Sequence, residues 1–171
     1  DGTEYFNGTF PFETGNQIWG SPAIGDIDND GILDIVITSK NKHLYVFDQF
    51  GLKLDYYTNQ YLVGTPALGN LDEDSDLEIV FGGFSSDAKL FALNIDGTDV
   101  EGFPFLLDEK MQKGVALADF NDNGKDDIVV GTDDDNVHLI YDDGSIAFSF
   151  LTEDKIRSAP IVIDISGEKI I

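Results

Sequence analysis

The sequence predicts an all-β protein assembled from repeated four-stranded antiparallel sheets. Three observations lead to this fold class: a segment that recurs about every 45 residues, short apolar runs rich in β-branched and aromatic residues, and turn residues between those runs. Runs of this kind, separated by Gly, Asp and Asn, are typical of strands joined by hairpins. No window keeps the i, i+3, i+4, i+7 apolar spacing over a helical length, so helices are not expected.

The repeated segment is clearest in its first half, where an apolar run leads into an acidic loop. Three full copies and one partial copy begin at Ser21 (SPAIGDIDNDGILDIVITS), Gly64 (GTPALGNLDEDSDLEIVFGG), Gly114 (GVALADFNDNGKDDIVVGT) and Ser158 (SAPIVIDISGEKII). Their equivalent positions, which are 44, 49 and 45 residues apart, are Asp26, Asn70, Asp119 and Asp164. A four-stranded unit of about 40–50 residues is the size of one β-propeller blade, so the repeat favours a propeller.

Each repeat continues with the same series of elements. A third strand is expected at HLYVFD, KLFALN and VHLIYD, and a turn follows at Gly51, Asp96-Gly97 or Asp143-Gly144. The first strands, in PAIGDI, PALGNL and VALADF, are expected to lie innermost. The fourth strands are rich in aromatic side chains, which are expected to pack between blades although they could also stack on sugars: Tyr56, Tyr57, Phe103, Phe105, Phe148 and Phe150.

These repeats divide residues 1–171, a partial β-propeller, into five segments. They are an outer strand of a preceding blade at 1–14, whole blades at 15–60, 61–107 and 108–153, and the first strand of a further blade at 154–171. A propeller closes with roughly four to eight blades, and proteins usually avoid open sheet edges. We therefore expect a fragment of a larger propeller, completed by the remaining blades of the same chain or by a swapped copy.

The composition narrows the classes of partner. The chain has 33 acidic against 10 basic residues, for a formal net charge of -23. Such a charge repels nucleic acid and anionic membranes, so no nucleic-acid partner is expected. No apolar stretch approaches the ~20 residues of a membrane span, so direct membrane insertion is not expected. The absence of Cys excludes disulfides and thiolate metal sites.

An acidic loop connects the first two expected strands of each whole blade. In the first blade, loop 26–34 has the pattern D-x-D-x-D-G-x-x-D, formed by Asp26, Asp28, Asp30, Gly31 and Asp34. Alternate side chains of such a loop turn toward a common centre, and Gly at the sixth position allows a positive φ that directs the seventh carbonyl, here that of Ile32, inward. Oxygen donors in this number suit Ca²⁺, which binds six to eight of them, better than Mg²⁺ or a transition metal.

The second and third blades repeat this loop with oxygen donors in the same register. The expected ligands in loops 70–78 and 119–127 are Asn70, Asp72, Asp74, the carbonyl of Asp76 and Glu78, and Asp119, Asn121, Asn123, the carbonyl of Lys125 and Asp127. Asp, Asn and Gly also form tight turns without a metal, but three loops in one register favour two or three structural calcium ions. An EF-hand is excluded, because the flanks are strands and the twelfth positions are Ile37, Phe81 and Val130 rather than Glu.

The three loops differ in charge. Their side-chain ligands include four carboxylates in the first loop, three in the second and two in the third. Ligand charge is one determinant of calcium affinity, so the first loop is expected to bind Ca²⁺ most tightly and the third most weakly. Ser75 replaces Gly at the sixth position of the second loop, which leaves the occupancy of that loop open. The partial fourth repeat keeps Asp164 but is too short to form such a loop.

The blades resemble the FG-GAP repeats, also called VCBS repeats, which build the propeller of integrin α chains and many bacterial surface proteins. The resemblance covers nearly the whole chain through segments of the PAIGDIDNDGILDIVI type, and the Phe-Gly pair of the family name is present at Phe81-Gly82. It implies a propeller with calcium in the hairpin between the first two strands of a blade. It also implies an extracellular, secreted or cell-surface location.

A catalytic site is not expected, because no nucleophile is accompanied by a base and no phosphate-binding loop follows a strand. His43 and His138 lie at or near the start of third strands, and the carboxylate clusters are explained as calcium loops. The leading hypothesis is a non-enzymatic, calcium-binding interaction or adhesion module that binds a protein or carbohydrate ligand through its propeller loops. Two alternatives stay open: part of a secreted polysaccharide-active lyase or hydrolase, and a structural scaffold with no ligand of its own.

Overall fold

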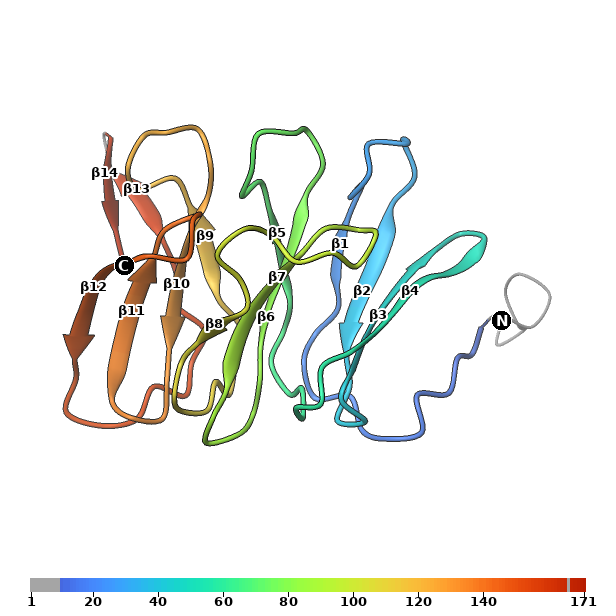
Figure 1. Ribbon diagram of the computed structural model, residues 1–171, viewed down its shortest axis with the longest axis horizontal. Helices are drawn as coiled ribbons and strands as arrows, with labels where there is room; N and C mark the ends of the chain where they lie inside the picture. Colours follow the sequence, from blue (N-terminus) through green and yellow to red (C-terminus); the bar gives the residue numbers. More distant parts are fainter. Residues whose placement is uncertain (1–9, 166) are drawn as a thin grey trace.

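In a computed structural model that describes residues 10–165 and 167–171, the chain is all-β. Its strands form three four-stranded antiparallel sheets and one two-stranded hairpin, which follow one another along the chain (Figure 1). No described residue is helical, and so none of the described part could cross a membrane as a helix. The fold class predicted from the sequence is confirmed.

Each sheet is a meander in which consecutive strands pair. The first sheet contains β1 (Ala23–Gly25), β2 (Asp34–Thr38), β3 (His43–Asp48) and β4 (Gly51–Tyr57). The second contains β5 (Ala67–Gly69), β6 (Glu78–Gly82), β7 (Lys89–Leu93) and β8 (Phe105–Leu106). The third contains β9 (Ala116–Ala118), β10 (Asp127–Gly131), β11 (Asn136–Ile140) and β12 (Ile146–Leu151). Each of the ranges 15–60, 61–107 and 108–153 therefore contains one four-stranded sheet.

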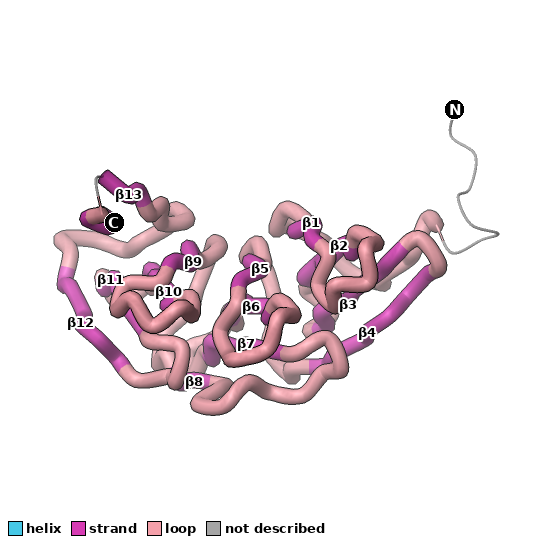
Figure 2. The backbone as a smooth tube through the Cα atoms, turned by 90° about the horizontal axis from the view of Figure 1, so that it is seen from above, coloured by secondary structure: helices cyan, strands magenta, loops and turns pink. Residues whose placement is uncertain are grey.

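The first strands of the three sheets lie next to one another. β5 contacts both β1 and β9. Seen from above, these short strands line the inner side of the row of sheets, and β4, β8 and β12 lie on its outer side (Figure 2). As predicted, the PAIGDI, PALGNL and VALADF segments provide the innermost strands.

Glycines that precede the inner strands allow neighbouring blades to approach closely. A Cβ atom at Gly20 would lie 2.4 Å from the carbonyl oxygen of Gly64, and one at Gly64 would lie 2.0 Å from the carbonyl oxygen of Lys113. Both distances are far shorter than a van der Waals contact. A larger residue at either position would push the blades apart, so the spacing of the blades requires glycine there.

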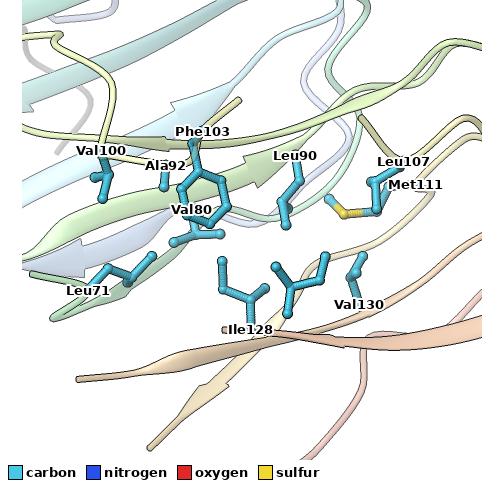
Figure 3. Close-up of a cluster of buried hydrophobic side chains, with 11 residues drawn as sticks. Leu71, Val80, Leu90, Ala92, Val100, Phe103, Leu107, Met111, Ile128 and Val130 are labelled. Atoms are coloured by element: carbon cyan, nitrogen blue, oxygen red, sulfur yellow. The ribbon is translucent and has the colours of Figure 1, made fainter. Parts of the chain in front are cut away.

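The core consists of two apolar clusters, each between neighbouring sheets. The cluster between the second and third sheets contains Leu71, Val80, Leu90, Ala92, Val100, Phe103, Leu107, Met111, Ile128, Val130 and Ile140 (Figure 3). The cluster between the first and second sheets contains Ile27, Val36, Leu44, Val46, Leu62, Ile79, Phe81, Phe91 and Leu93. Because the second sheet contributes to both clusters, every residue of β6 is buried.

The aromatic residues of the fourth strands differ in burial. Phe103 belongs to the core, and Phe105 and Tyr56 pack against it, as predicted for inter-blade packing. Phe148 and Phe150 are 43% and 64% exposed. The reason is that β12 contacts only β11 among the described strands, so no described strand covers its outer face.

The segment at 154–171 differs from its prediction. One strand was expected, but the segment contains two that pair as a hairpin, β13 (Ile163–Ile165) and β14 (Glu168–Ile170). Gly167 reverses the chain with a φ of 89°, a left-handed conformation that favours glycine. The partial blade therefore contributes two short strands.

Only part of the segment at 1–14 can be compared with its prediction, because residues 1–9 lie outside the described part. Residues 11–14 form no strand. The rings of Phe10 and Phe12 pack against that of Phe47 in β3, with centroids 5.4 and 4.9 Å apart. This segment therefore covers part of the outer face of the first sheet.

Candidate metal centre

The three acidic loops connect the first and second strands of the three sheets, as predicted. They join β1 to β2, β5 to β6 and β9 to β10, and all three project from the same end of the sheets (Figure 1). In each loop the ninth residue is also the first residue of the second strand. The second strand therefore fixes the position of the last predicted ligand.

In the first loop, residues 26–34, aspartate side chains hold the backbone in a tight turn. The carboxylate of Asp26 accepts hydrogen bonds from the backbone nitrogens of Asp30 at 3.0 Å and Gly31 at 2.9 Å. Gly31 has a φ of 84°, as expected for the sixth position. One oxygen each of Asp26, Asp28 and Asp30 lie within 4.8 Å of one another, so the loop brings three carboxylates to one point.

The second loop, residues 70–78, gathers Asp72, Asp74 and Glu78, with one oxygen of each within 4.8 Å of the others. Glu78 is 1% exposed; its Oε2 accepts a hydrogen bond from the backbone nitrogen of Leu71, and its Oε1 has no hydrogen-bond partner among the described residues. Burial raises the pKa of Glu78 to about 7; the hydrogen bond from Leu71 opposes the shift, and the charges of Asp72 and Asp74 add to it. A cation would stabilise all three carboxylates in their ionised form.

The backbone of the second loop differs from that of the other two. Gly31 and Gly124 have positive φ values at the sixth position, but Ser75 does not, because a left-handed conformation is unfavourable for a residue with a Cβ. Instead, Nδ2 of Asn70 donates to the carbonyl oxygen of Asp74 at 3.0 Å. The amide oxygen of Asn70 is thereby left free to bind a cation.

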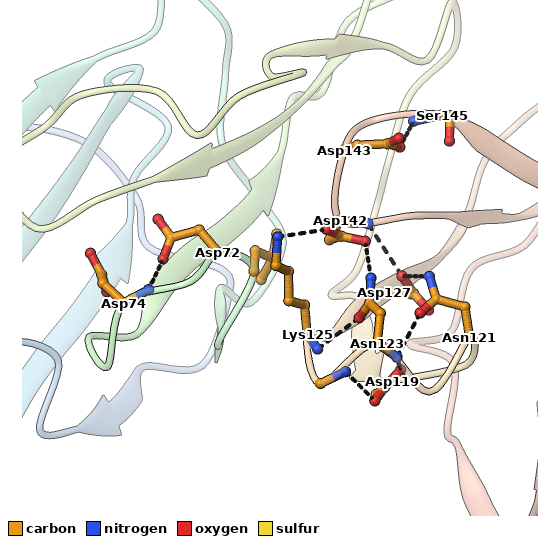
Figure 4. Close-up of polar contacts among 12 residues, drawn as sticks. Asp72, Asp74, Asp119, Asn121, Asn123, Lys125, Asp127, Asp142, Asp143 and Ser145 are labelled. Atoms are coloured by element: carbon orange, nitrogen blue, oxygen red, sulfur yellow. Dashed lines mark hydrogen bonds and ion pairs between the residues drawn. The ribbon is translucent and has the colours of Figure 1, made fainter.

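In the third loop, residues 119–127, more of the buried polar groups form hydrogen bonds than in the first two loops (Figure 4). The carboxylate of Asp119 accepts from the backbone nitrogens of Asn123 at 3.1 Å and Gly124 at 2.9 Å, as Asp26 does in the first loop. Asp127 is fully buried, and its Oδ1 accepts from Nδ2 of Asn121 at 3.4 Å. With only two carboxylates among its predicted ligands, this loop has less negative charge to neutralise.

The ninth position has the same role in all three loops. The backbone nitrogens of Ile27, Leu71 and Phe120, each the second residue of its loop, donate to the carboxylates of Asp34, Glu78 and Asp127. One oxygen of the ninth residue therefore fixes the loop. The other oxygen has no partner among the described residues in Glu78, whereas in Asp34 it contacts Lys53 and in Asp127 it accepts hydrogen bonds from Asn121 and Asp142.

The seventh position is also held in the same way in each loop. The backbone nitrogens of Ile32, Asp76 and Lys125 donate to the side chains of Asp30, Asp74 and Asn123, at 2.7, 2.8 and 2.8 Å. Each seventh peptide thus lies beside the fifth ligand. Binding through its carbonyl oxygen stays a prediction.

Three buried side-chain oxygens in the first two loops have neither a hydrogen-bond nor an ion-pair partner among the described residues. They are Asp28 Oδ1, Asn70 Oδ1 and Glu78 Oε1. All three belong to residues predicted as metal ligands, whereas the buried Oδ1 of Asp34 forms an ion pair with Nζ of Lys53. A buried acceptor without a partner costs about 1–3 kcal/mol, so a cation bound to these oxygens would remove that cost.

Lys53 was not found by reasoning from the sequence. It lies in β4, and its Nζ is 2.8 Å from Oδ2 of Asp28 and 3.0 Å from Oδ1 of Asp34. Burial alone would lower the pKa of Lys53, but its hydrogen bonds to the two aspartates and their charges outweigh burial and raise it. The sequence signal was a lysine in the fourth strand of the first blade, where the fourth strands of the other two blades have no basic residue.

Hydrogen bonds also join the loops of neighbouring blades. Between the first and second loops, the backbone nitrogen of Leu77 donates to the carbonyl oxygen of Ile27 at 2.8 Å. Nδ2 of Asn29 donates to Oδ1 of Asp76 at 3.2 Å. The acidic loops therefore form a connected row along one end of the sheets.

The two histidines lie in β3 and β11, as predicted, and their contacts are within their own sheets. Nδ1 of His43 contacts the carboxylate of Asp55, and its ring stacks on Tyr45 at 5.5 Å. Nδ1 of His138 lies 2.7 Å from Oγ of Ser149. The partners of both histidines in these contacts, Asp55, Tyr45 and Ser149, are not predicted metal ligands.

No model of a known protein family matches the sequence, and no curated protein matches it either. Solved structures do match. BamB from Moraxella catarrhalis superposes with a TM-score of 0.54 at 14% identity, over 82% of this chain and 38% of BamB. The C-terminal domain of PilY1 from Pseudomonas aeruginosa superposes with a TM-score of 0.62 at 16% identity, over 84% of this chain and 40% of that domain.

A third match is BBS1N in its complex with ARL6DN, with a TM-score of 0.59 at 15% identity, over 79% of this chain and 44% of BBS1N. All three are β-propeller proteins. The chain has a β-propeller fold. It spans less than half of each of these structures, and its open row of sheets fits part of a propeller.

Proposed function

We propose that this chain is a calcium-binding β-propeller module that binds a protein or glycan at the cell surface or outside the cell. The observation that carries the calcium proposal is Glu78, a buried carboxylate beside Asp72 and Asp74 whose Oε1 has no hydrogen-bond partner in the described part of the chain. Carboxylate, amide and carbonyl oxygens are the ligands that Ca²⁺ prefers. The buried amide oxygen of Asn70, in the same loop and also without a hydrogen-bond partner among the described residues, supports the same ion.

Calcium in these loops would be structural. It would neutralise carboxylates that otherwise repel one another, and so stabilise the folded state. Because hydrogen bonds connect the loops of neighbouring blades, ordering one loop would also support the next. Calcium at this end of the sheets would thereby hold the blades in their relative positions.

A role in recognition is supported by the fold and by the charge. Ordered loops at the end of a rigid propeller can form a binding surface without any catalytic residue. BBS1N, which shares the fold, was solved in a complex with ARL6DN. The net charge of -23 favours cationic or neutral partners over nucleic acid. At an extracellular location we expect the calcium sites to have Kd values of about 10⁻⁴–10⁻³ M, as extracellular calcium modules do.

Two measurements test the proposed function. Isothermal titration with CaCl₂, and with MgCl₂ as a control, should show at least one calcium site that magnesium fills poorly. Binding of the labelled chain to a glycan array and to cell surfaces should then be stronger in calcium than in EGTA. No heat of calcium binding would contradict the metal site, and calcium-independent or absent ligand binding would contradict the recognition role.

A further inference from the structure

The first acidic loop already contains a cation, and the protein supplies it. Lys53 reaches from β4 into loop 26–34, where its Nζ lies 2.8 Å from Oδ2 of Asp28 and 3.0 Å from Oδ1 of Asp34. The side chain of Lys53 is 20% exposed, and that of Asp34 is fully buried. Charge-assisted contacts at these distances are strong. The ammonium group therefore neutralises two of the carboxylates predicted to bind calcium, at the third and ninth positions.

The repeat shows that this lysine is specific to the first blade. In the third strands of the three sheets, the equivalent residues Phe47, Leu93 and Ile140 pair with Leu52, Asp99 and Ile146. The residues that follow those partners are Lys53, Val100 and Ala147. The position that provides an ammonium group to the first loop thus provides only apolar groups in the other two blades.

The second loop has no such internal cation. No lysine, arginine or histidine in the described part of the chain forms an ion pair with Asp72, Asp74 or Glu78. Lys125 lines the hollow beside this loop, but it pairs with Asp142 in the next sheet, at 3.5 Å. No basic side chain in the described part of the chain therefore neutralises these three carboxylates, and their negative charge can attract an external cation.

We infer that Lys53 takes the place of a calcium ion in the first loop, so that Ca²⁺ binds the second loop more tightly than the first. This inference rests on the proposed calcium function of the second loop. Calcium binds oxygen at about 2.3–2.6 Å, so an ion held by Asp28 and Asp34 would lie next to an ammonium group that contacts the same two carboxylates. The two cations repel each other, and calcium can enter only when Lys53 leaves.

The inference reverses the order expected from the number of carboxylates. The first loop has the most carboxylates, but the charge of Lys53 neutralises part of them at any calcium concentration. The first blade would then stay ordered when calcium is low, and only the blades that follow it would be stabilised by added calcium. Lys53 is thus a residue that determines which loop binds the metal.

Calcium titration of loop variants tests this assignment. Asp72→Asn should weaken calcium binding in the otherwise unchanged chain by about tenfold or more, a loss of ~1.4 kcal/mol. Asp28→Asn should leave the affinity and the number of bound ions nearly unchanged. Lys53→Met, which removes the charge and keeps most of the side chain, should gain one bound ion, and Asp28→Asn should remove that ion again. Lys113→Met, at an exposed position, is the matched control and should bind like the unchanged chain.

Two results would overturn the inference and leave the proposed function intact. One is a Lys53→Met variant with no additional calcium. The other is a loss of calcium with Asp28→Asn as large as the loss with Asp72→Asn. This second comparison does not depend on whether Lys53→Met folds. An unchanged chain that binds no calcium at all would instead contradict the proposed function, so the two failures are distinguishable.

Discussion

Asn70 and Asp126 exchange two hydrogen bonds across the boundary between the second and third sheets. The backbone nitrogen of Asp126 donates to the carbonyl oxygen of Asn70 at 2.6 Å, and the backbone nitrogen of Asn70 donates to Oδ2 of Asp126 at 3.1 Å. Asn70 is the first residue of the second loop, and Asp126 is the eighth residue of the third. The equivalent eighth residues of the other loops, Leu33 and Leu77, have no side-chain acceptor. The side chain of Asp126 is therefore an additional link between two candidate calcium loops.

Replacing this link should weaken both stability and calcium binding. Asp126→Leu leaves the backbone nitrogen of Asn70 without its acceptor, at a cost of about 1–3 kcal/mol. For a domain of this size, we expect Tm to decrease by ~2–4 °C for each kcal/mol of stability that is lost. Calcium affinity at the second loop should fall several-fold because its first ligand is less well positioned. Calorimetry and calcium titration measure both effects.

Asp126→Asn is the control for this link, because its amide oxygen can still accept the hydrogen bond from Asn70. It should retain most of the stability and calcium affinity of the unchanged chain. Equal calcium affinity in all three proteins would show that the loops bind calcium independently of their contact.

Removal of calcium should lower the melting temperature. An ion that binds only the folded state adds about 2.7 kcal/mol at one hundred times its Kd. With calcium in the second and third loops, and ~2–4 °C per kcal/mol, EGTA should lower Tm by more than about ten degrees. Added Ca²⁺ should restore the loss fully and Mg²⁺ only in part. Identical melting curves with and without EGTA would mean that the loops are acidic turns and not metal sites.

The strands and the positions of the loops could be predicted because the repeat encodes them locally. Asp34, Glu78 and Asp127 stand at the ninth position of each loop in the sequence, and each begins the second strand of its sheet. Turn residues and alternating apolar residues are sufficient to predict such short-range structure. The predicted innermost strands followed from the order of a propeller meander.

Contacts between different elements could not be predicted in the same way. Lys53 is 25 residues from Asp28, and Asn70 is 56 residues from Asp126. These contacts depend on the register between strands and on the close approach of blades, which neither composition nor spacing reveals. For this reason the number of carboxylates alone gave an order of calcium affinity that leaves Lys53 out.

His138 should make a destabilising contribution in mild acid. Burial lowers the pKa of His138, although the charge of nearby Asp134 opposes the shift. The unfolded chain takes up a proton near the ordinary value of about 6.5, and so binds more protons than the folded chain below that pH. The contribution of His138 to the free energy of unfolding should therefore fall as the pH decreases through about 6.5, while the raised pKa of Glu78 contributes in the opposite direction. His138→Gln should lose less of its Tm than the unchanged chain between about pH 7.5 and about pH 5.5. An equal loss in both proteins would show that His138 titrates alike in the folded and unfolded states.

Glu78→Gln should change the stability of the protein in opposite directions with and without calcium. In EGTA, the variant should be at least as stable as the unchanged chain, because it replaces a buried carboxylate that has one unpaired oxygen with a neutral amide. In saturating calcium, the variant should be the less stable of the two, because the second loop has lost the charge that attracts the ion. Calorimetry in both buffers measures the two differences.

The control for Glu78→Gln is Glu153→Gln, which removes the same charge from an exposed position outside the loops. It should leave the calcium-dependent difference in Tm unchanged, because exposed charges interact weakly through solvent. If Glu78→Gln destabilised the protein equally in EGTA and in calcium, its carboxylate would be required by the fold alone. The unpaired Oε1 would then have no metal partner, and the second loop could not be the calcium site.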